Sequence, residues 1–399
     1  MISINSYLHR EKFRDLISRW MYNRPLPDDA ELVTRLVHFN NAYISRYLML
    51  FSEKVFSGLH GGRLVSRFAP HKGELKDAIV ANAPFDTPRM ELLASDYRKN
   101  PERYFRETPF HGTMYFLPRE QTEILIGSSR IKRVRRLAEK SARRIIDHTF
   151  QAIKRHADEM AARRARDLGV SRQALISDPD EMLREFLSAE NRLLDDLRHN
   201  RAIDFEEDLI INDVAGIKVI LEDKQYNLAL NVFERADNCV VIEEEPHHGN
   251  YNAINLIVRY TPDKDRILSR PVGPAMLKLI ERRGLDPAEA GREFENFVRS
   301  GEDEVNIEVI VSNYQEMMES EIGRCIHEDR IIQQRLKQEY RGPLAKNVEY
   351  LMVFLFNFAV SPQSELGELP IKLWNRYLPD YVDEVLRSLF DIPPLRLVD

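Results

Sequence analysis

This chain of 399 residues has little cysteine, and it lacks the cysteine patterns of disulfide-rich and zinc-binding domains. Only Cys239 and Cys325 occur, and neither stands in a C-x-x-C pair or in the Cys/His spacing of a zinc site. The sequence therefore predicts two thiols buried as small apolar groups, in a protein of a reducing compartment.

Long hydrophobic runs are also missing. The most apolar stretch, residues 351–360, is far too short to cross a bilayer, which needs about 20 residues. The N-terminal residues carry charges throughout and lack the apolar core of a secretory signal. We therefore expect a cytoplasmic protein with no membrane partner, and a buried helix at 351–360.

An excess of positive charge is absent as well. The formal net charge is -6, which argues against a general nucleic-acid coat. The charge is nevertheless uneven, because residues 130–144 contain eight Lys or Arg and a single acid, Glu139. Such a basic stripe could surround the phosphates of a nucleotide, whose negative charge needs several cations. It could also be a solvated helix face or bind an RNA backbone.

Hydrophobic periodicity divides the chain into helical and β-rich parts. It predicts helices within residues 1–60, while the absence of Gly and Pro predicts a long helix over 130–168. Residues 60–118 are rich in Gly and Pro, so loops and short elements are expected there. Together the elements indicate an α+β fold with a mixed sheet of four or five strands. The predicted strands are 209–221, 239–243, 253–260 and 305–311, and further helices are predicted at 178–200, 226–236, 276–300, 314–340 and within 345–399.

Two strand carboxylates are the first candidates for chemistry. Asp213 sits among apolar residues just before Gly216, and Glu308 alternates with apolar neighbours on the last strand. Two carboxylates on neighbouring strands would repel strongly unless a divalent cation shared them, and Mg²⁺ prefers such oxygen ligands beside phosphates. The alternative is that each acid only faces solvent, as strand acids commonly do.

A turn rich in Pro, Gly and Asn precedes one of the predicted strands and brings Tyr251 to its start. An aromatic ring at this place could stack on a purine base, although ordinary packing on the sheet is the simpler interpretation. His247 and His248 are expected as exposed turn residues, because no third metal ligand lies at a suitable spacing.

The order and spacing of these pieces resemble the synthetase domain of RelA/SpoT-type pyrophosphokinases. That family places Arg-x-Lys and, eight residues later, a second Lys in its ATP-binding segment. A strand of the form D-h-h-G/A-h-R (h, apolar) follows, which residues 213–218 match with Lys in place of the final Arg. Next come a P-K-x-N-G-Y-Q-S-L-H turn, a strand with a central Glu, and a helix with E-x-G-x-x-x-H. The matching positions are Arg130, Lys132, Lys140, Asp213, Lys218, Tyr226, Pro246, Tyr251, Glu308, Glu321, Gly323 and His327.

The resemblance covers about 125–335 and implies a sheet of the nucleotidyltransferase type packed by helices. Two helical insertions, near 145–203 and 262–303, would interrupt this domain. Residues 1–120 would then form a mostly helical N-terminal region of unknown role, and residues 340–399 a helical C-terminal extension. The role of both extensions is open and includes regulation or a homo-oligomer contact.

The resemblance also implies a mechanism. Asp213 and Glu308 would bind Mg²⁺ at the β- and γ-phosphates of ATP, and Glu308 would help to deprotonate the acceptor 3′-hydroxyl, with AMP as the leaving group. The remaining roles implied are donor phosphate binding by Arg130, Lys132, Lys140 and Lys218, acceptor binding by Tyr251, Asn255 and His247, and support from behind the site by Glu321 and His327.

The sequence departs from the family on the acceptor side, so the acceptor stays open. Where the family has Lys, His, Gln and Arg, this chain has His247, Asn255, Ile310 and Ser312. The first hypothesis is alarmone synthesis on GDP or GTP, without hydrolysis, because the H-D pair of the family's hydrolase domain is missing. The others are pyrophosphate transfer to another nucleotide or to the 3′ end of tRNA or other RNA, and a relative that binds nucleotides without catalysis.

Overall fold

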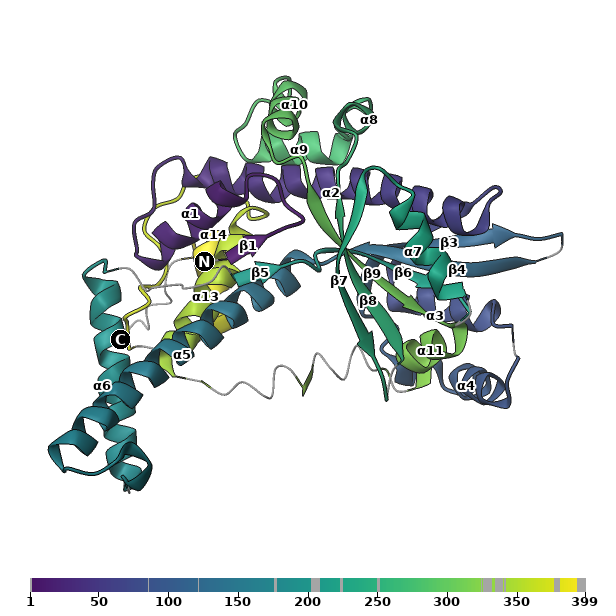
Figure 1. The fold of residues 1–399 in the computed structure, drawn as a ribbon. Coiled ribbons are helices and arrows are strands. Elements are labelled where there is room, and N and C mark those ends of the chain that lie inside the picture. The colour runs from purple at the N-terminus through teal and green to yellow at the C-terminus, as the bar shows by residue number, and fades with distance from the viewer. Residues whose placement is uncertain are drawn as a thin grey trace, which may run out of the picture.

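The structure is a computed structural model of the whole chain, and its described residues form 13 α-helices and two sheets (Figure 1). The fold is therefore α+β, as the sequence predicts. The residues described are 2–84, 86–120, 122–175, 178–201, 209–222, 225–249, 252–323, 325, 332–333, 340, 342–376 and 381–392.

A mixed sheet of seven strands forms the centre of the molecule (Figure 1). Its strands β6 and β9 are parallel, and every other neighbouring pair is antiparallel. In spatial order the strands are β2 (Val65–His71), β3 (Pro109–Pro118), β4 (Glu123–Ile131), β6 (Ala215–Ile220), β9 (Val305–Ser312), β8 (Ala253–Tyr260) and β7 (Cys239–His247).

The expected count of four or five strands was too low. The unforeseen strands are β2, β3 and β4, and β2 and β3 come from the stretch where we expected loops and short elements. In β3 the buried Phe110, Met114 and Phe116 alternate as a strand requires, but Gly112 and the flanking prolines hide the pattern. The basic stripe led us to expect a helix from residue 130, but β4 extends to Ile131. The helix that follows begins only at Val134.

The predicted strand 209–221 is in fact two strands with a break between them. β5 (Leu209–Ile211) does not belong to the large sheet and pairs in parallel with β1 (Ile2–Ile4). Only β6 is part of the large sheet. Residues 212–214 connect the two and carry Asp213. The break turns this segment away from regular strand geometry, which hydrophobicity alone does not reveal because both halves are apolar.

One face of the sheet packs on the long helix α2 (Asp29–His60) and on α7 (Tyr226–Glu234). Inward-facing strand residues such as Ile217, Val309 and Leu256 are fully buried there. The core continues past the end of the sheet, where α1 (Arg10–Met21) and α13 (Pro343–Phe358) join α2 (Figure 1). The apolar stretch at 351–360 is thus a buried helix, as predicted.

The opposite face is covered over only part of its width. There α3 (Lys72–Ala81), α4 (Pro88–Lys99) and α11 (Tyr314–Met318) bury a smaller core that includes Ile220 of β6. Further along the same strands this face carries polar residues such as Arg130 and Glu308, which stay half-buried. The candidate site lies on this part of the face.

The remaining helices lie around this framework. The helix α5 (Val134–Asp167) packs on α13 and forms a projecting hairpin with α6 (Pro179–Arg198), which Arg164 ties together through ion pairs to Glu181 and Glu185 (Figure 1). The predicted helix 276–300 is divided into two. The other helices are α8 (Lys264–Leu268), α9 (Pro274–Arg282), α10 (Ala290–Ser300) and α14 (Tyr381–Phe390), with a π-helical turn at Glu319–Gly323 and 3₁₀ turns at Pro101–Tyr104 and Arg172–Ala174.

Within the described ranges, no helix is both long enough and apolar enough to span a lipid bilayer.

Close packing of α2 on β4 depends on Gly127. A methyl group at this position would lie 2.2 Å from the carbonyl oxygen of Lys218 and 2.6 Å from the ring of Phe56. We therefore expect Gly127→Ala to lower the free energy of unfolding by about 1–3 kcal/mol, as overpacked cores do. Urea unfolding measures this. The matched control is Gly367→Ala, which meets no atom within 4 Å and should change stability by less than about 0.5 kcal/mol; equal losses in both variants would contradict the packing argument.

Candidate functional site

The candidate site is built where β4, β6 and β9 lie side by side. The register places Arg130 opposite Gly216 on one side and Glu308 opposite Gly216 on the other. The carboxylate of Glu308 lies beside Gly216: a Cβ atom built on this glycine would be in ordinary van der Waals contact with Glu308 Oε2, at 3.5 Å. The Glu308 carboxylate therefore lies next to β6, the strand that directly follows the segment carrying Asp213.

Asp213 lies between two lysine side chains. Its Oδ2 accepts from Lys132 Nζ at 2.5 Å and from Lys140 Nζ at 2.6 Å. Burial raises the pKa of the Asp213 carboxyl, but the two ammonium groups outweigh burial and hold that pKa well below its ordinary value. Its other oxygen, Oδ1, is buried and has no hydrogen-bond partner among the described residues. Asp213 is therefore anionic at neutral pH and keeps one oxygen for a further ligand.

The pKa of Glu308 is shifted in the opposite direction to that of Asp213. Burial raises the pKa of its carboxyl, and the negative charge of Asp213 raises it further, while Lys132, Arg130 and Lys140 act in the opposite direction. The two acids are thus close enough to repel each other, although Asp213 and Glu308 are 95 positions apart in the sequence. Such a pair is the arrangement that an added cation would relieve.

The three cations come from the end of β4 and the start of α5. Lys132 follows directly on β4, and its backbone N–H donates to the carbonyl of Val214 at 2.7 Å, which fixes it beside Asp213. Lys140 reaches the same carboxylate from the second turn of α5. Burial lowers the pKa of Lys132, and Asp213 works against that shift. The part of the basic stripe nearest the acids is therefore turned toward them.

The donor set suits Mg²⁺ held together with a nucleotide. Two carboxylates offer oxygen ligands, and the buried Oδ1 of Asp213 is an acceptor without a donor. Among the residues that the structure describes, no group of three or more Asp, Glu, His or Cys side chains could hold a metal ion by itself. Mg²⁺ in phosphate-handling sites commonly takes one or two carboxylates and completes its shell with phosphate oxygens and water, which is what this set allows.

Lys218 is not placed with the other three cations. Its Nζ donates to Glu321 Oε1 at 2.8 Å, and Lys72 donates to the other oxygen of the same carboxylate. All three residues are almost completely buried. The expectation that Lys218 holds donor phosphates therefore has no support in the geometry. Instead Glu321, which we expected behind the site, anchors Lys218 there.

On the acceptor side the structure describes two of the expected residues. Asn255 of β8 is level with Ile310 of β9, one row along from Glu308, and its Oδ1 is buried without a described partner. His247 at the end of β7 is half-buried, with Nε2 3.8 Å from Glu245 of its own strand. Tyr251 and His327 lie outside the described residues.

A group of asparagines next to the acids was not foreseen. Asn5 Nδ2 and Asn306 Nδ2 both donate to Asn212 Oδ1, each at 3.0 Å. Asn212 immediately precedes Asp213, and Asn306 stands two residues before Glu308. Each asparagine only ends or interrupts an apolar run in the sequence, so nothing there distinguishes it from a turn residue.

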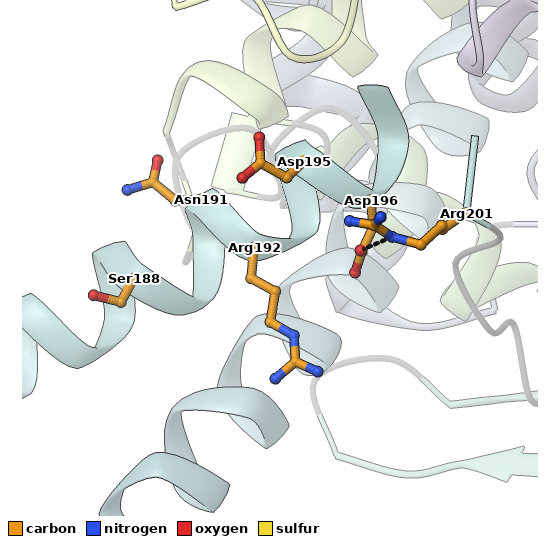
Figure 2. A pocket seen from close by; sticks show the side chains of 6 residues that line it. All are labelled: Ser188, Asn191, Arg192, Asp195, Asp196 and Arg201. Carbon is orange, nitrogen blue, oxygen red and sulfur yellow. Dashed lines mark hydrogen bonds and ion pairs between the residues drawn. The ribbon is translucent and has the colours of Figure 1, made fainter. Parts of the chain in front are cut away.

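Figure 2 shows a separate hollow on α6. Two acids and two arginines balance its charge, and Arg201 donates to Asp196 at 2.5 Å along one side. None of the residues of the acid site takes part, and the polar lining offers no apolar wall for a base. The lining residues are Ser188, Asn191, Arg192, Asp195, Asp196 and Arg201.

Comparisons with protein-family models, with curated proteins and with solved structures found no match to this chain.

The raised pKa of Glu308 predicts a stability effect. A carboxyl whose pKa is higher in the folded than in the unfolded protein destabilises the fold above its ordinary pKa and has no effect well below it. Without divalent cations, Glu308→Gln should therefore raise the Tm at neutral pH, and the difference from wild type should vanish as the pH falls below the ordinary glutamate range. Thermal melts from pH 3 to 8 in EDTA measure this.

The matched control is Glu243→Gln on the exposed edge strand β7, in the same row of the sheet as Glu308. This variant should stay within about 0.5 kcal/mol of wild type at every pH. A Glu308→Gln protein that is less stable than wild type at neutral pH would contradict the repulsion argued for the acid pair.

Proposed function

We propose that this protein is a Mg²⁺-dependent pyrophosphokinase that transfers the β,γ-pyrophosphate of ATP to the 3′-hydroxyl of a guanine nucleotide. The observation that carries the proposal is the meeting of Asp213 and Glu308, from distant segments, beside Lys132, Lys140 and Arg130. The choice of pyrophosphate transfer, among the reactions that such a site could perform, comes from the motif resemblance.

The residues proposed to hold the phosphates of ATP are assigned by their positive charge. Lys132 and Lys140 share one carboxylate oxygen, so each ammonium retains further N–H donors that a phosphate can use. Arg130 adds a guanidinium with planar donors suited to a phosphate. These three cations would hold the triphosphate and offset the charge that moves to the leaving AMP. Lys218, bound to Glu321, is left out of this role.

Asp213 and Glu308 are the residues that would hold Mg²⁺. When bound, the metal ion supplies charge neutralisation at the phosphates and relieves the repulsion between the two acids. Glu308 would accept the proton of the acceptor 3′-hydroxyl on a carboxylate oxygen, and a raised pKa suits a proton acceptor. A bond then forms from the 3′ oxygen to the β-phosphorus, and the bond from that phosphorus to the AMP oxygen breaks.

The acceptor would lie across β9, β8 and β7, beyond Glu308. Asn255 supplies a buried oxygen that receives no hydrogen bond from the described residues, and an N–H or O–H of the acceptor could satisfy it. His247 stands further along the same face at the sheet edge. A guanine nucleotide remains the proposed acceptor because the resemblance implies it, with Tyr251 as the proposed stacking residue.

The test is a transfer assay with γ-labelled ATP and Mg²⁺. GDP, GTP, ATP and deacylated tRNA are offered separately, and the labelled product is resolved by chromatography. Label on GDP or GTP supports the proposal. Label on tRNA or ATP alone would replace the proposed acceptor, and label on none of them would remove the proposed activity.

Both carboxylates should be essential for transfer. We expect Asp213→Asn and Glu308→Gln each to lower the transfer rate by at least about 100-fold, since even partners of metal ligands cost 10–100-fold when removed. Circular dichroism and thermal melts should show that both variants remain folded. Glu102→Gln, at an exposed residue of the 3₁₀ turn Pro101–Tyr104, is the control and should keep the wild-type rate. A variant of either acid that retains substantial transfer would exclude that residue from the mechanism.

A second candidate acceptor, the 3′ end of an RNA, is favoured by one observation. Further along α5, Arg135 is 76% exposed and Arg144 is exposed, so cations continue from the donor site onto the open surface. If RNA binds there, log affinity should fall linearly with log salt, and Arg135→Ala with Arg144→Ala should reduce that slope by roughly one to two units. Fluorescence anisotropy with labelled tRNA measures it. An unchanged slope would speak against this candidate.

A further inference from the structure

The N-terminal residues 3–6 are built into the site from behind. The backbone N–H of Asn5 donates to the carbonyl of Ile211 at 3.0 Å, and the carbonyl of Asn5 accepts from the N–H of Asn306 at 3.0 Å. Ser6 Oγ also donates to the carbonyl of Asn306 at 2.7 Å. This short piece of chain thus lies between the segment that leads to Asp213 and the segment that leads to Glu308.

The side chain of Asn212 joins the same three segments. Its Oδ1 receives one amide hydrogen from Asn5 and one from Asn306, and Ser3 Oγ donates to Asn5 Oδ1 at 2.9 Å. Both lone pairs of the Asn212 carbonyl oxygen are used. Each hydrogen bond of the network therefore has a fixed donor and acceptor. An apolar residue at 212 would remove the acceptor oxygen and leave the side-chain amides of Asn5 and Asn306 without this hydrogen bond.

Asp213 lies between two fixed points. Asn212 on one side is held by this network, and the carbonyl of Val214 on the other side accepts from the N–H of Lys132 at 2.7 Å. These contacts compensate for the break between β5 and β6, where regular pairing no longer holds the chain. Asn306 links the same network to β9, two residues from Glu308.

From these contacts we propose that Asn212, with Asn5 and Asn306, is a positioning residue that sets the position of the Asp213 carboxylate relative to Glu308 for binding a divalent cation. The inference rests on the proposed function, because it assigns the network a role toward the cation. It gives the N-terminal segment a part in the site: residues more than 200 positions away hold one acid in place.

The test measures cation binding directly. Mn²⁺ replaces Mg²⁺, and its binding is titrated by electron paramagnetic resonance with full-length protein and an ATP analogue that has a methylene group between the α- and β-phosphorus. We expect Asn212→Ala to weaken Mn²⁺ binding by roughly 10- to 100-fold, the usual loss when a residue that orients a metal ligand is removed. Asn212→Asp keeps an acceptor oxygen for both amides and should restore most of the affinity.

Asn40→Ala is the matched control. Asn40 is fully buried, whereas Asn212 is half-buried, and it also ties down the N-terminal segment, through hydrogen bonds with the N–H of Leu8 at 2.7 Å and the carbonyl of Leu8 at 3.1 Å. This variant should lose at least as much thermal stability as Asn212→Ala, yet keep the wild-type Mn²⁺ affinity. A loss of affinity in Asn40→Ala equal to that in Asn212→Ala would show a purely structural role and overturn the proposal.

The outcomes separate this inference from the proposed function. If wild type binds Mn²⁺ and transfers pyrophosphate while Asn212→Ala binds Mn²⁺ equally well, only the positioning role is lost. The same holds if Asn212→Asp binds as weakly as Asn212→Ala. If wild type binds no Mn²⁺ in the presence of the analogue, both the positioning role and the proposed function are overturned. A variant that fails to fold is replaced by Asn5→Ala, which removes one of the two donors to Asn212 and should weaken binding in the same direction.

Discussion

The parallel pairing of β6 with β9 is the constraint on which the site depends. It places Gly216 beside Glu308, so that the glutamate carboxylate lies next to the strand that follows Asp213. Two acids held in this way repel each other, and the fold offsets the repulsion by placing Lys132 and Lys140 on Asp213. The charge of the site is then close to balance, because the three cations Arg130, Lys132 and Lys140 surround the two carboxylates. That arrangement has the charges that the proposed metal–nucleotide complex would need, with acids for a cation and lysines for an anion.

The rest of the molecule maintains this pairing from both faces of the sheet. On one face α2 provides a continuous apolar support, and close packing at Gly127 brings it against β4. On the other face α3 and α11 cover only the strand ends, and the buried pairing of Glu321 with Lys72 and Lys218 marks the boundary of that cover. A buried ion network of this kind gives little net stability compared with apolar packing. Its effect here is to direct Lys218 away from the acids.

The sequence was informative about residues and poor about pairing. The alternation around Glu308 is a local signal that places this residue correctly on a strand, whereas Asp213 lies in the connection between β5 and β6 and Arg130 lies in β4 rather than in a helix. The hydrogen bonds around the site are not local. Lys218 pairs with Glu321, 103 positions away, and Asn5 donates to Asn212, 207 positions away. Hydrophobic periodicity cannot report a hydrogen bond between distant polar residues, nor a strand such as β3 whose apolar alternation is interrupted by glycine and proline. For the same reason the ion pair of Lys218 with Glu321 was not foreseen.

The energetics of the acid pair bear on whether this chain is a working enzyme or a relative that only binds nucleotides. A half-buried carboxylate whose pKa is raised by burial and by a second acid is a cost to the fold, since a neutral side chain of similar size would avoid it. The asparagine network adds a further cost, because the buried amide of Asn306 and the half-buried amides of Asn5 and Asn212 need matched partners. The lysines alone could hold a nucleotide, and neither the acid pair nor the asparagine network would then be needed. An arrangement that accepts both costs is better explained by a cation that must be placed accurately at a reacting phosphate than by binding, and this is the reason for preferring catalysis.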